Sequence, residues 1–551
     1  MNLFLVWARF ALKRPLLMGM LAAYPCHAQD TARMDQIVQS YVTDKKFMGT
    51  VLVARDKVLF SKGYGMANLE WNIPNAPDVK FRLGSITKQF TAASILLLEE
   101  RGKLSTNDPV KKYMPDAPAT WDKITIYHLL THTSGIPSFT GLPAYSSLEA
   151  FAITPEKLVA LFRDKPLEFQ PGEKWNYSNS GYALLGYLIE KISGQSYPQF
   201  LQENILTPLG MKDSGYDSNT AIIARRASGY TAASGGIENS GFINMTVPFS
   251  AGALYSTTED LLRWEQGLFG GKILSPAELQ KMTTPFKNNY ACGLFVSERK
   301  GKKLIQHGGG IEGFNTSLAY YPDDKLTVIA LANLNGSAPD EITAELGDVV
   351  HGEPVRLPSE RKELELSPAI LSRYVGTYDF PGGAKMLIML TGDQLYTKLA
   401  SQPQVAIYPE SEKLFFAKVV DAEIEFVTDK NGAVTNLILH QNGMDQTAPR
   451  ISAAVEVPPE RKAITVPVET LKQYVGTYEL APGVDIDMTL DGDQLMTQVT
   501  GQPKFPLFAE TTTRFFLKVV DAQVDFVKDA DGKVNNIVLH QNGMDHTAAR
   551  K

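Results

Sequence analysis

The pattern of apolar and polar positions divides the chain into a mixed helix and strand region followed by a region of strands alone. In the first region, short apolar runs predict strands at residues 49–54, 57–60, 303–306, 316–321 and 326–331. Apolar residues at helical spacing predict helices at residues 85–101, 182–192 and 340–350, with another helix before the first strand. Strands at both ends with helices between them predict an α+β domain whose sheet is assembled from both ends of the segment.

The C-terminal region contains one pattern twice. Tyr374-Val-Gly-Thr-Tyr378 recurs at residues 474–478, an offset of 100, and other short stretches recur with the same offset. In the second copy, apolar residues at 484, 486, 488 and 490 alternate with polar ones, which is the period of a half-buried strand. Each copy is therefore predicted to be a small all-β domain, an antiparallel barrel or sandwich.

Charged and proline-rich stretches at residues 352–365 and 457–462 mark the joints between these parts. We therefore expect one α+β domain at residues 29–355 and two repeat domains at residues 356–455 and 456–551.

The first 28 residues predict a secretory signal peptide. Three basic residues precede an apolar run at residues 15–24 that is too short to span a bilayer as a helix, and small residues at Cys26 and Ala28 suit cleavage. Cys26 as a lipidated cysteine is the alternative, which the preceding residues 23–25 disfavour. Cleavage leaves Cys292 as the one cysteine, so no intrachain disulfide is expected. The mature chain is expected to be secreted, in a bacterial periplasm, and to have no transmembrane helix.

Composition excludes several function classes. The 551 residues carry 54 Lys and Arg against 60 Asp and Glu, a net charge of −6, and 44% are hydrophobic. These values argue against disorder, against a fibre and against a basic nucleic-acid-binding surface. The eight histidines are scattered, and no Cys, His and Asp cluster has metal-ligand spacing, so neither a metal nor another cofactor is expected.

The first chemical motif is Ser85-x-x-Lys88, at the start of the predicted helix 85–101. Helical spacing places the two side chains on one face, about a turn apart, so that a lysine with a lowered pKa could accept the serine proton. The same spacing also occurs at Ser297 and Ser359, in charged turns or linkers without a following apolar helix. The structural alternative for Ser85 is a helix cap with Lys88 solvated.

Two further motifs follow in the chain. Tyr177-x-Asn179 lies in a polar loop before the helix 182–192, where a phenol can move a proton and a carboxamide can orient a lysine. The alternative is that both residues only cap the helix.

The third motif is His307-Gly308-Gly309-Gly310, placed at the end of an apolar strand. Glycines there indicate close approach by another backbone or by a ligand. The alternative is a plain glycine turn with a surface histidine. His132, in a Thr-His-Thr-Ser-Gly stretch, is expected to anchor a loop by a hydrogen bond.

Taken together, these three motifs resemble the penicillin-binding-protein-like serine hydrolases, in the branch of class C β-lactamases, D-alanyl-D-alanine carboxypeptidases, D-aminopeptidases and esterases. The resemblance covers about residues 35–350. It implies a β-lactamase/transpeptidase-like catalytic domain with an antiparallel sheet flanked by helices and a helical region. The two repeats look like the lipocalin-like or barrel-like domains appended to D-aminopeptidase-type members.

The resemblance also implies roles for the motif residues. Ser85 would be acylated, Lys88 and Tyr177 would move its proton, and Asn179 would position Lys88 and the substrate. Backbone N–H groups of Ser85 and Gly310 would form the oxyanion hole, in a site bounded by His307, Gly308 and Gly309. β-Lactamases usually have lysine where this chain has His307. A largely neutral histidine holds a substrate carboxylate less well, which favours amide, peptide or ester substrates.

We therefore expect a secreted serine hydrolase that acts on a small-molecule or peptide substrate of the β-lactam, D-amino-acid peptide or ester class. The alternative is a catalytically weak protein that binds or senses penicillin or peptidoglycan fragments.

Overall fold

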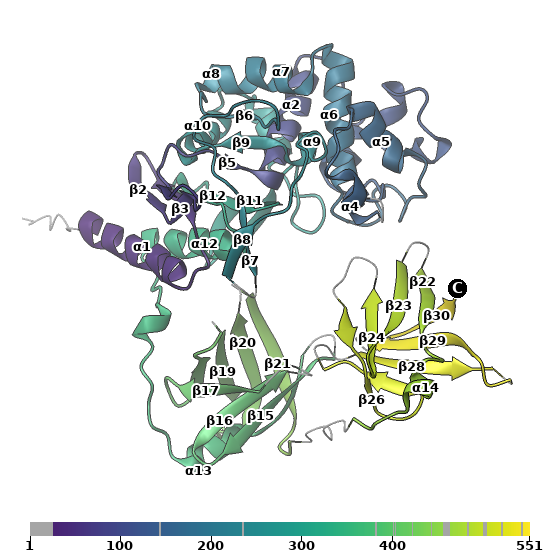
Figure 1. Cartoon of the computed structure of the whole chain (residues 1–551). Helices are drawn as coiled ribbons and strands as arrows, with labels where there is room; N and C mark the ends of the chain where they lie inside the picture. The colour runs from purple at the N-terminus through teal and green to yellow at the C-terminus, as the bar shows by residue number, and fades with distance from the viewer. Residues whose placement is uncertain are drawn as a thin grey trace, which may run out of the picture.

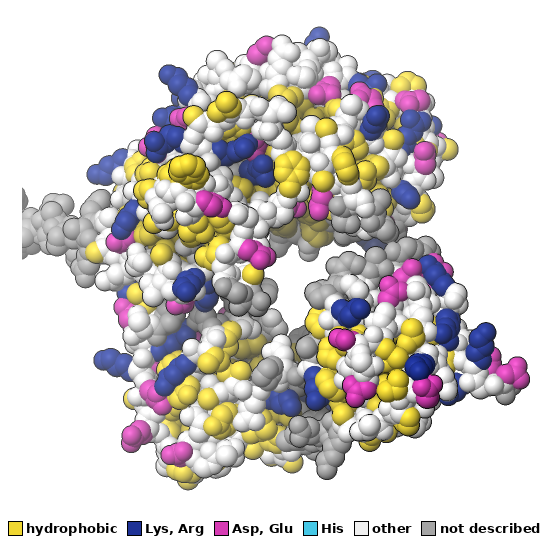
Figure 2. Space-filling model, viewed as in Figure 1, with side chains coloured by type: hydrophobic (Ala, Val, Ile, Leu, Met, Phe, Trp, Pro, Cys, Tyr) yellow, Lys and Arg dark blue, Asp and Glu magenta, His cyan; other side chains and the backbone are white. Residues whose placement is uncertain are grey.

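The computed structural model describes residues 26–551 except 143–144, 234–235, 381–382, 400–401, 403, 421, 442–443, 456–462, 482–483, 500–503, 519–521, 530 and 542–543. Residues 1–25 of the predicted signal peptide lie outside the described residues. Figure 1 shows three parts: an α+β domain, a first β domain below it and a second β domain beside the first. On the face shown in Figure 2, cationic and anionic side chains are interspersed over all three parts.

A six-stranded antiparallel sheet forms the centre of the α+β domain, in the order β10-β11-β12-β13-β1-β2. Its strands are β1 Gly49–Ala54, β2 Val58–Tyr64, β10 Phe295–Arg299, β11 Lys302–Ile311, β12 Phe314–Tyr321 and β13 Leu326–Ala332. β1 pairs with β13 from Gly49 opposite Ala332 to Ala54 opposite Thr327. The two ends of the domain are thus joined in the middle of one sheet, as the sequence predicts.

Helices cover both faces of this sheet (Figure 1). On one face, α1 (Cys26–Thr43) and α12 (Ala338–Val350) share an apolar cluster with Val51, Val53 and Val328. The other face carries the larger cluster, which includes the principal helices α2 Thr87–Glu100, α6 Asn179–Ser193 and α10 Thr258–Phe269. This second layer supplies the elements that carry the motifs.

Shorter elements complete the helical region. They are α3 Ile126–Leu130, α4 Tyr145–Leu148, α5 Pro155–Arg163, α7 Tyr197–Leu201, α8 Thr207–Leu209, α9 Phe249–Gly252 and α11 Pro276–Met282. Small sheets pair β3 Met66–Asn68 with β4 Ile73–Pro74, β7 Tyr230–Ala233 with β8 Gly236–Asn239, and β9 Leu254–Ser256 with both β5 Phe81–Arg82 and β6 Gly215–Tyr216.

Two expectations about the motifs need correction. Ser85 is not in the first turn of an α-helix: it lies in the 3-10 turn η1 (Gly84–Ile86), and α2 begins at Thr87. The backbone reverses at Gly84, whose φ is 54°, and this sharp turn tightens the entry to the helix. The glycines after His307 do not follow a strand end either, because β11 runs through them to Ile311. Glycine is required there by close packing and not by a turn.

The first repeat is a closed antiparallel barrel of eight strands, β14 to β21. The strands are β14 Gly376–Asp379, β15 Lys385–Thr391, β16 Gln394–Leu399, β17 Val405–Pro409, β18 Leu414–Ala417, β19 Ala422–Thr428, β20 Val434–Gln441 and β21 Met444–Ser452, with helix α13 (Pro368–Leu371) before them. Its interior is filled by side chains such as Tyr374, Tyr378 and Phe426.

In the second repeat the strands follow one another in the same order as in the first, except that one strand is divided into two. Its strands are β22 Gly476–Ala481, β23 Val484–Asp491, β24 Gln494–Val499, β25 Phe505–Pro506, β26 Phe508–Ala509, β27 Arg514–Phe516, β28 Ala522–Lys528, β29 Val534–Gln541 and β30 Met544–Arg550, after helix α14 (Val468–Leu471). β25 and β26 end the sheet and together correspond to β17. The break falls at Leu507, whose N–H still donates to the Leu495 carbonyl of β24 at 2.8 Å.

Linker segments fasten each barrel. Leu364 N–H donates to the Pro409 carbonyl at 2.8 Å, and Ile464 N–H donates to the Ala509 carbonyl at the same distance, again 100 residues apart. The first linker also contacts the α+β domain, where Arg33 pairs with Glu360. None of the helices in the described part of the chain has the length and apolar character that a membrane crossing requires.

Candidate active site

The turn that carries Ser85 is held from both sides. Leu83 N–H donates to the Leu254 carbonyl at 2.8 Å, and the Leu83 carbonyl accepts from Thr316 Oγ1 at 2.7 Å. Ser85 itself is partly exposed although its chain neighbours are buried. Neither η1 nor α2 has a side-chain cap, so the alternative that Ser85 caps the helix is wrong.

Lys88 lies under Ser85 and is completely buried. Its Nζ lies 2.8 Å from Ser85 Oγ, 2.9 Å from Asn179 Oδ1 and 2.9 Å from the Ala251 carbonyl oxygen. Burial lowers the pKa of Lys88 well below its ordinary value. The alternative of a solvated surface lysine is therefore wrong.

The three contacts of Nζ suit a neutral amine. A neutral amine has two N–H groups and one lone pair, whereas the oxygens of Asn179 and Ala251 can only accept. A protonated Nζ donates to all three oxygens, whereas the neutral amine donates to Asn179 and Ala251 and turns its lone pair to the Ser85 hydroxyl. In this state Lys88 is arranged to take the proton of the serine.

Tyr177 and Asn179 flank the start of α6. The cap of this helix is Ser178, whose side chain accepts from Gly181 N–H at 3.3 Å, so the two motif residues are free for other contacts. The Tyr177 hydroxyl interacts with Ser85, and Lys88 Nζ lies 4.8 Å from the centre of the Tyr177 ring. Burial raises the pKa of Tyr177, so the phenol keeps its proton at neutral pH.

Residues 132–140 hold the segment that carries these two side chains. Asn179 N–H donates to Ser138 Oγ, and Asn179 Nδ2 donates to Thr140 Oγ1, both at 3.1 Å. Asn176 N–H donates to the His132 carbonyl at 3.0 Å, and Ser178 N–H donates to His132 Nδ1 at 3.1 Å. The predicted loop-anchoring hydrogen bond of His132 is thus present.

His307 is buried in β11, with 3% of its surface exposed, so the alternative of a surface histidine is wrong. Its Nδ1 lies 2.6 Å from the Gly308 carbonyl and carries the proton, and Nε2 accepts from the Tyr290 hydroxyl at 3.2 Å. Burial, with Lys88 nearby, lowers the pKa of His307 to about 3. The imidazole is therefore neutral at pH 7 and offers no positive charge.

The glycines of β11 lie against the Ser85 turn. A Cβ on Gly309 would stand 1.9 Å from the Leu83 carbonyl oxygen, and a Cβ on Gly84 would stand 2.8 Å from Gly310 N. A Cβ on Gly308 would stand 3.3 Å from the Asp340 carboxylate and 3.6 Å from the Thr316 carbonyl oxygen. Gly309 is thus the glycine that close packing requires, and the exposed Gly310 borders Ser85.

The structure brings the predicted residues together: Lys88 hydrogen-bonds both Ser85 and Asn179, the Tyr177 ring lies beside Lys88, and His307 adjoins Tyr177 at 6.3 Å between ring centres. Sequence patterns miss several partners of this group: the Ala251 carbonyl, Thr140 Oγ1, Ser138 Oγ and the Tyr290 hydroxyl. No motif marks them, because each acts through a contact between distant segments.

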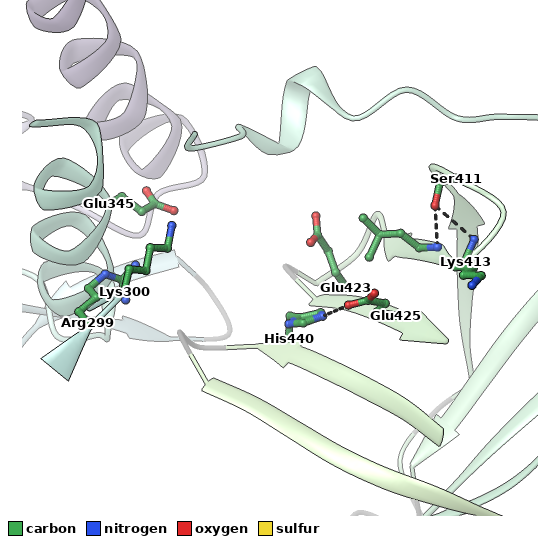
Figure 3. Close-up of a pocket in the computed structure, with 9 residues that line it drawn as sticks. Arg299, Lys300, Glu345, Ser411, Lys413, Glu423, Glu425 and His440 are labelled. Atoms are coloured by element: carbon green, nitrogen blue, oxygen red, sulfur yellow. Dashed lines mark hydrogen bonds and ion pairs between the residues drawn. The ribbon is translucent and has the colours of Figure 1, made fainter. Parts of the chain in front are cut away.

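Elsewhere in the molecule, a cleft of about 640 Å³ lies between the α+β domain and the first barrel (Figure 3). Arg299, Lys300 and Glu345 line one wall, and Ser411, Lys413, Leu414, Glu423, Glu425 and His440 line the other. None of the residues that line this cleft belongs to the three motifs. Within the described ranges, no group of three or more His, Cys, Asp and Glu side chains is placed to hold a metal ion.

Comparisons with known proteins agree with this geometry. The family described as Beta-lactamase matches residues 34–351, and a domain of unknown function, DUF3471, matches residues 360–451 and 460–549. Penicillin-binding protein 4* of Bacillus subtilis is 30% identical over 445 residues, which cover 74% of this chain and 95% of the relative.

Two solved structures are also similar. The octameric penicillin-binding protein homologue from Pyrococcus abyssi has a TM-score of 0.56 and 27% identity, and the match covers 76% of this chain and all of that one. A D-stereospecific amidohydrolase from Streptomyces has a TM-score of 0.51 and 26% identity, over 59% of this chain and 99% of that one.

Proposed function

The chain belongs to the beta-lactamase family, as a serine hydrolase of the β-lactamase and D,D-peptidase type, and on that premise we propose that it cleaves an amide, peptide or ester bond through an acyl-enzyme on Ser85. One observation carries the proposal: a fully buried Lys88 whose Nζ lies 2.8 Å from a partly exposed Ser85 hydroxyl. We also propose that the chain is secreted, with cleavage after Ala28.

Acylation begins with proton transfer from Ser85 Oγ to the neutral amine of Lys88. The Oγ attacks the substrate carbonyl carbon, and the carbonyl π electrons move to the oxygen. We assign the backbone N–H groups of Ser85 and Gly310 to that oxyanion, since the Gly84 turn lies directly against Gly310. The positive charge left on Lys88 is adjacent to the same centre, where it favours the anionic intermediate.

The intermediate collapses when its carbonyl re-forms and the bond to the leaving group breaks. Tyr177 donates its proton to the leaving nitrogen or oxygen and regains one from Lys88, which becomes neutral again. A water then attacks the acyl-enzyme with Lys88 and Tyr177 taking its proton, and Ser85 leaves with a proton restored. Asn179 keeps Lys88 oriented through its side-chain oxygen.

The substrate class follows from His307. A neutral imidazole already bonded to Tyr290 and Gly308 cannot pair with a carboxylate as a lysine would. We therefore favour D-amino-acid amides, peptides and short esters over β-lactams, which the similarity to a D-stereospecific amidohydrolase supports.

The test is the intact mass of the mature protein over time with benzylpenicillin, a chromogenic ester and D-amino-acid amides, with Ser85→Ala as the blank. We expect a Ser85-dependent acyl adduct or Ser85-dependent turnover of at least one of these substrates. Activity that survives in Ser85→Ala would refute the acyl-enzyme. A penicillin adduct without turnover of any substrate would favour a binding or sensing protein.

A further inference from the structure

The ring and carbonyl of His132 bracket Tyr177. The carbonyl accepts from the N–H of the residue before Tyr177, at 3.0 Å, and ring Nδ1 accepts from the N–H of the residue after it, at 3.1 Å. The His132 ring also packs on the Tyr177 ring, with 4.3 Å between centres. Three contacts from one residue thus fix both the backbone and the ring of the tyrosine.

Two features of His132 oppose folding. Its φ is 56°, in the left-handed region that non-glycine residues seldom adopt, and only 1% of its surface is exposed. Because Nδ1 accepts, the ring proton is on Nε2, which has no hydrogen-bond partner among the described residues. Backbone strain and an unsatisfied buried N–H each oppose folding, and such costs are typical of functional sites.

From these contacts we propose that His132 is a positioning residue for Tyr177, which sets the phenol where it can protonate the leaving group. The ring acts as a neutral hydrogen-bond acceptor and not as a base, because Nδ1 is occupied by Ser178 N–H. The inference rests on the proposed role of Tyr177 in proton transfer.

Substrates with different leaving groups distinguish a positioning role of His132 from a general contribution to folding. An amide nitrogen must be protonated to leave, whereas a nitrophenolate leaves without a proton. A displaced Tyr177 therefore slows acylation by an amide far more than acylation by a nitrophenyl ester, whereas deacylation is common to both substrates. Loss of folded protein would instead lower both rates by one factor.

Three variants of His132, made in the mature protein, separate the contributions of its backbone conformation, its ring and its acceptor nitrogen. His132→Gly accepts the left-handed backbone but removes ring and acceptor, His132→Asn tolerates that backbone and supplies an oxygen acceptor, and His132→Phe keeps a ring without the acceptor. Thr131→Val is the matched control, since Thr131 is buried in the same loop and bonds to Thr133 and Tyr127.

We expect His132→Gly and His132→Phe each to lower the ratio of amide to ester acylation rates, measured in single turnovers, by about tenfold or more. His132→Asn should recover part of the ratio, and Thr131→Val should leave it at the wild-type value. An unchanged ratio in a folded His132→Gly, or His132→Asn no better than His132→Gly, would overturn the proposal.

Tyr177→Phe distinguishes failure of this inference from failure of its premise. If Tyr177→Phe lowers the ratio and the His132 variants do not, only the positioning role is wrong. If Tyr177→Phe leaves the ratio unchanged, the proton-transfer role of Tyr177 is wrong.

Discussion

The α+β domain and the two barrels bury different kinds of side chain. The α+β domain encloses titratable groups, among them Lys88, His132, His307 and Glu265, each 3% exposed or less. In the described parts of the barrels, no Lys, His, Asp or Glu residue as a whole is buried to this degree, and the buried polar residues other than tyrosine are Thr377 and Thr497. Desolvating a titratable group opposes folding, so the burial of Lys88 and His307 around Ser85 indicates that the chemistry of the site required them there.

The largest expected effect is at Lys88. Lys88→Met removes the proton acceptor of Ser85 and should lower turnover by about 10²- to 10⁴-fold. Lys300→Met is the matched control, because Lys300 also follows a serine by three residues but is 44% exposed and pairs with Asp348. Steady-state kinetics of both variants make the test. An equal loss of activity in the two would contradict the special role of the buried Lys88.

Gly309→Ala tests whether close packing sets the geometry of the site. The new Cβ would stand 1.9 Å from the Leu83 carbonyl oxygen, so the Ser85 turn must shift, and we expect about a 10²-fold loss of turnover. Overpacking should also lower the unfolding free energy by about 1–3 kcal/mol. In Gly308→Ala the nearest atom to the new Cβ is a side-chain carboxylate oxygen at 3.3 Å, so this variant should stay close to wild type in kinetics and thermal unfolding.

The pH profile of acylation reports the buried lysine directly. Burial lowers the pKa of Lys88, so the amine is protonated and inactive below that pKa and neutral above it. The acylation rate should rise about tenfold per pH unit on this acid limb and then level. A profile that instead rises only near the ordinary lysine pKa would contradict a desolvated base.

The same group predicts a stability effect of known sign. The unfolded chain holds the Lys88 proton up to about pH 10.4, whereas the folded chain releases it at lower pH. Between these two pKa values the unfolded state binds more protons, so the unfolding free energy of wild type rises with pH relative to Lys88→Met. Denaturant unfolding of both proteins across this range measures the difference.

The smallest effect is expected in the barrels, where tyrosines serve packing. Tyr378 Oη donates to the Tyr374 carbonyl at 2.8 Å, and Tyr478 Oη donates to the Tyr474 carbonyl at 2.9 Å. Tyr378→Phe and Tyr478→Phe should each lower the unfolding free energy by about 1–2 kcal/mol and leave turnover unchanged. A loss of turnover in either variant would place part of the chemistry in the repeats.

Much of the fold was predictable from local patterns. The strand predicted at residues 49–54 is β1 with the same bounds, because all six residues are buried and its apolar run is unbroken. The division of the strand equivalent to β17 into β25 and β26 was not predictable, because no local pattern marks Leu507 as a break.

The candidate site was predictable in its motif residues and not in their support. Spacing brings Lys88 beside Ser85, but the Ala251 carbonyl that shares Nζ lies 163 residues away and shows no pattern. The turn at Gly84 and the passage of β11 through Gly308 to Gly310 depend on two segments that meet only in the folded domain. Contacts of this kind are set by tertiary packing, which local periodicity does not encode.

Each barrel is hydrogen-bonded to the linker that precedes it, through Leu364 and Pro409 in the first repeat and through Ile464 and Ala509 in the second. The repeating unit is therefore a linker together with its barrel, and both units have the same length. Deleting or duplicating one such unit would leave every linker beside the barrel it fastens. Because the first linker also contacts the α+β domain through Arg33 and Glu360, we expect the second unit to be the one whose loss or duplication leaves the rest of the fold as it is.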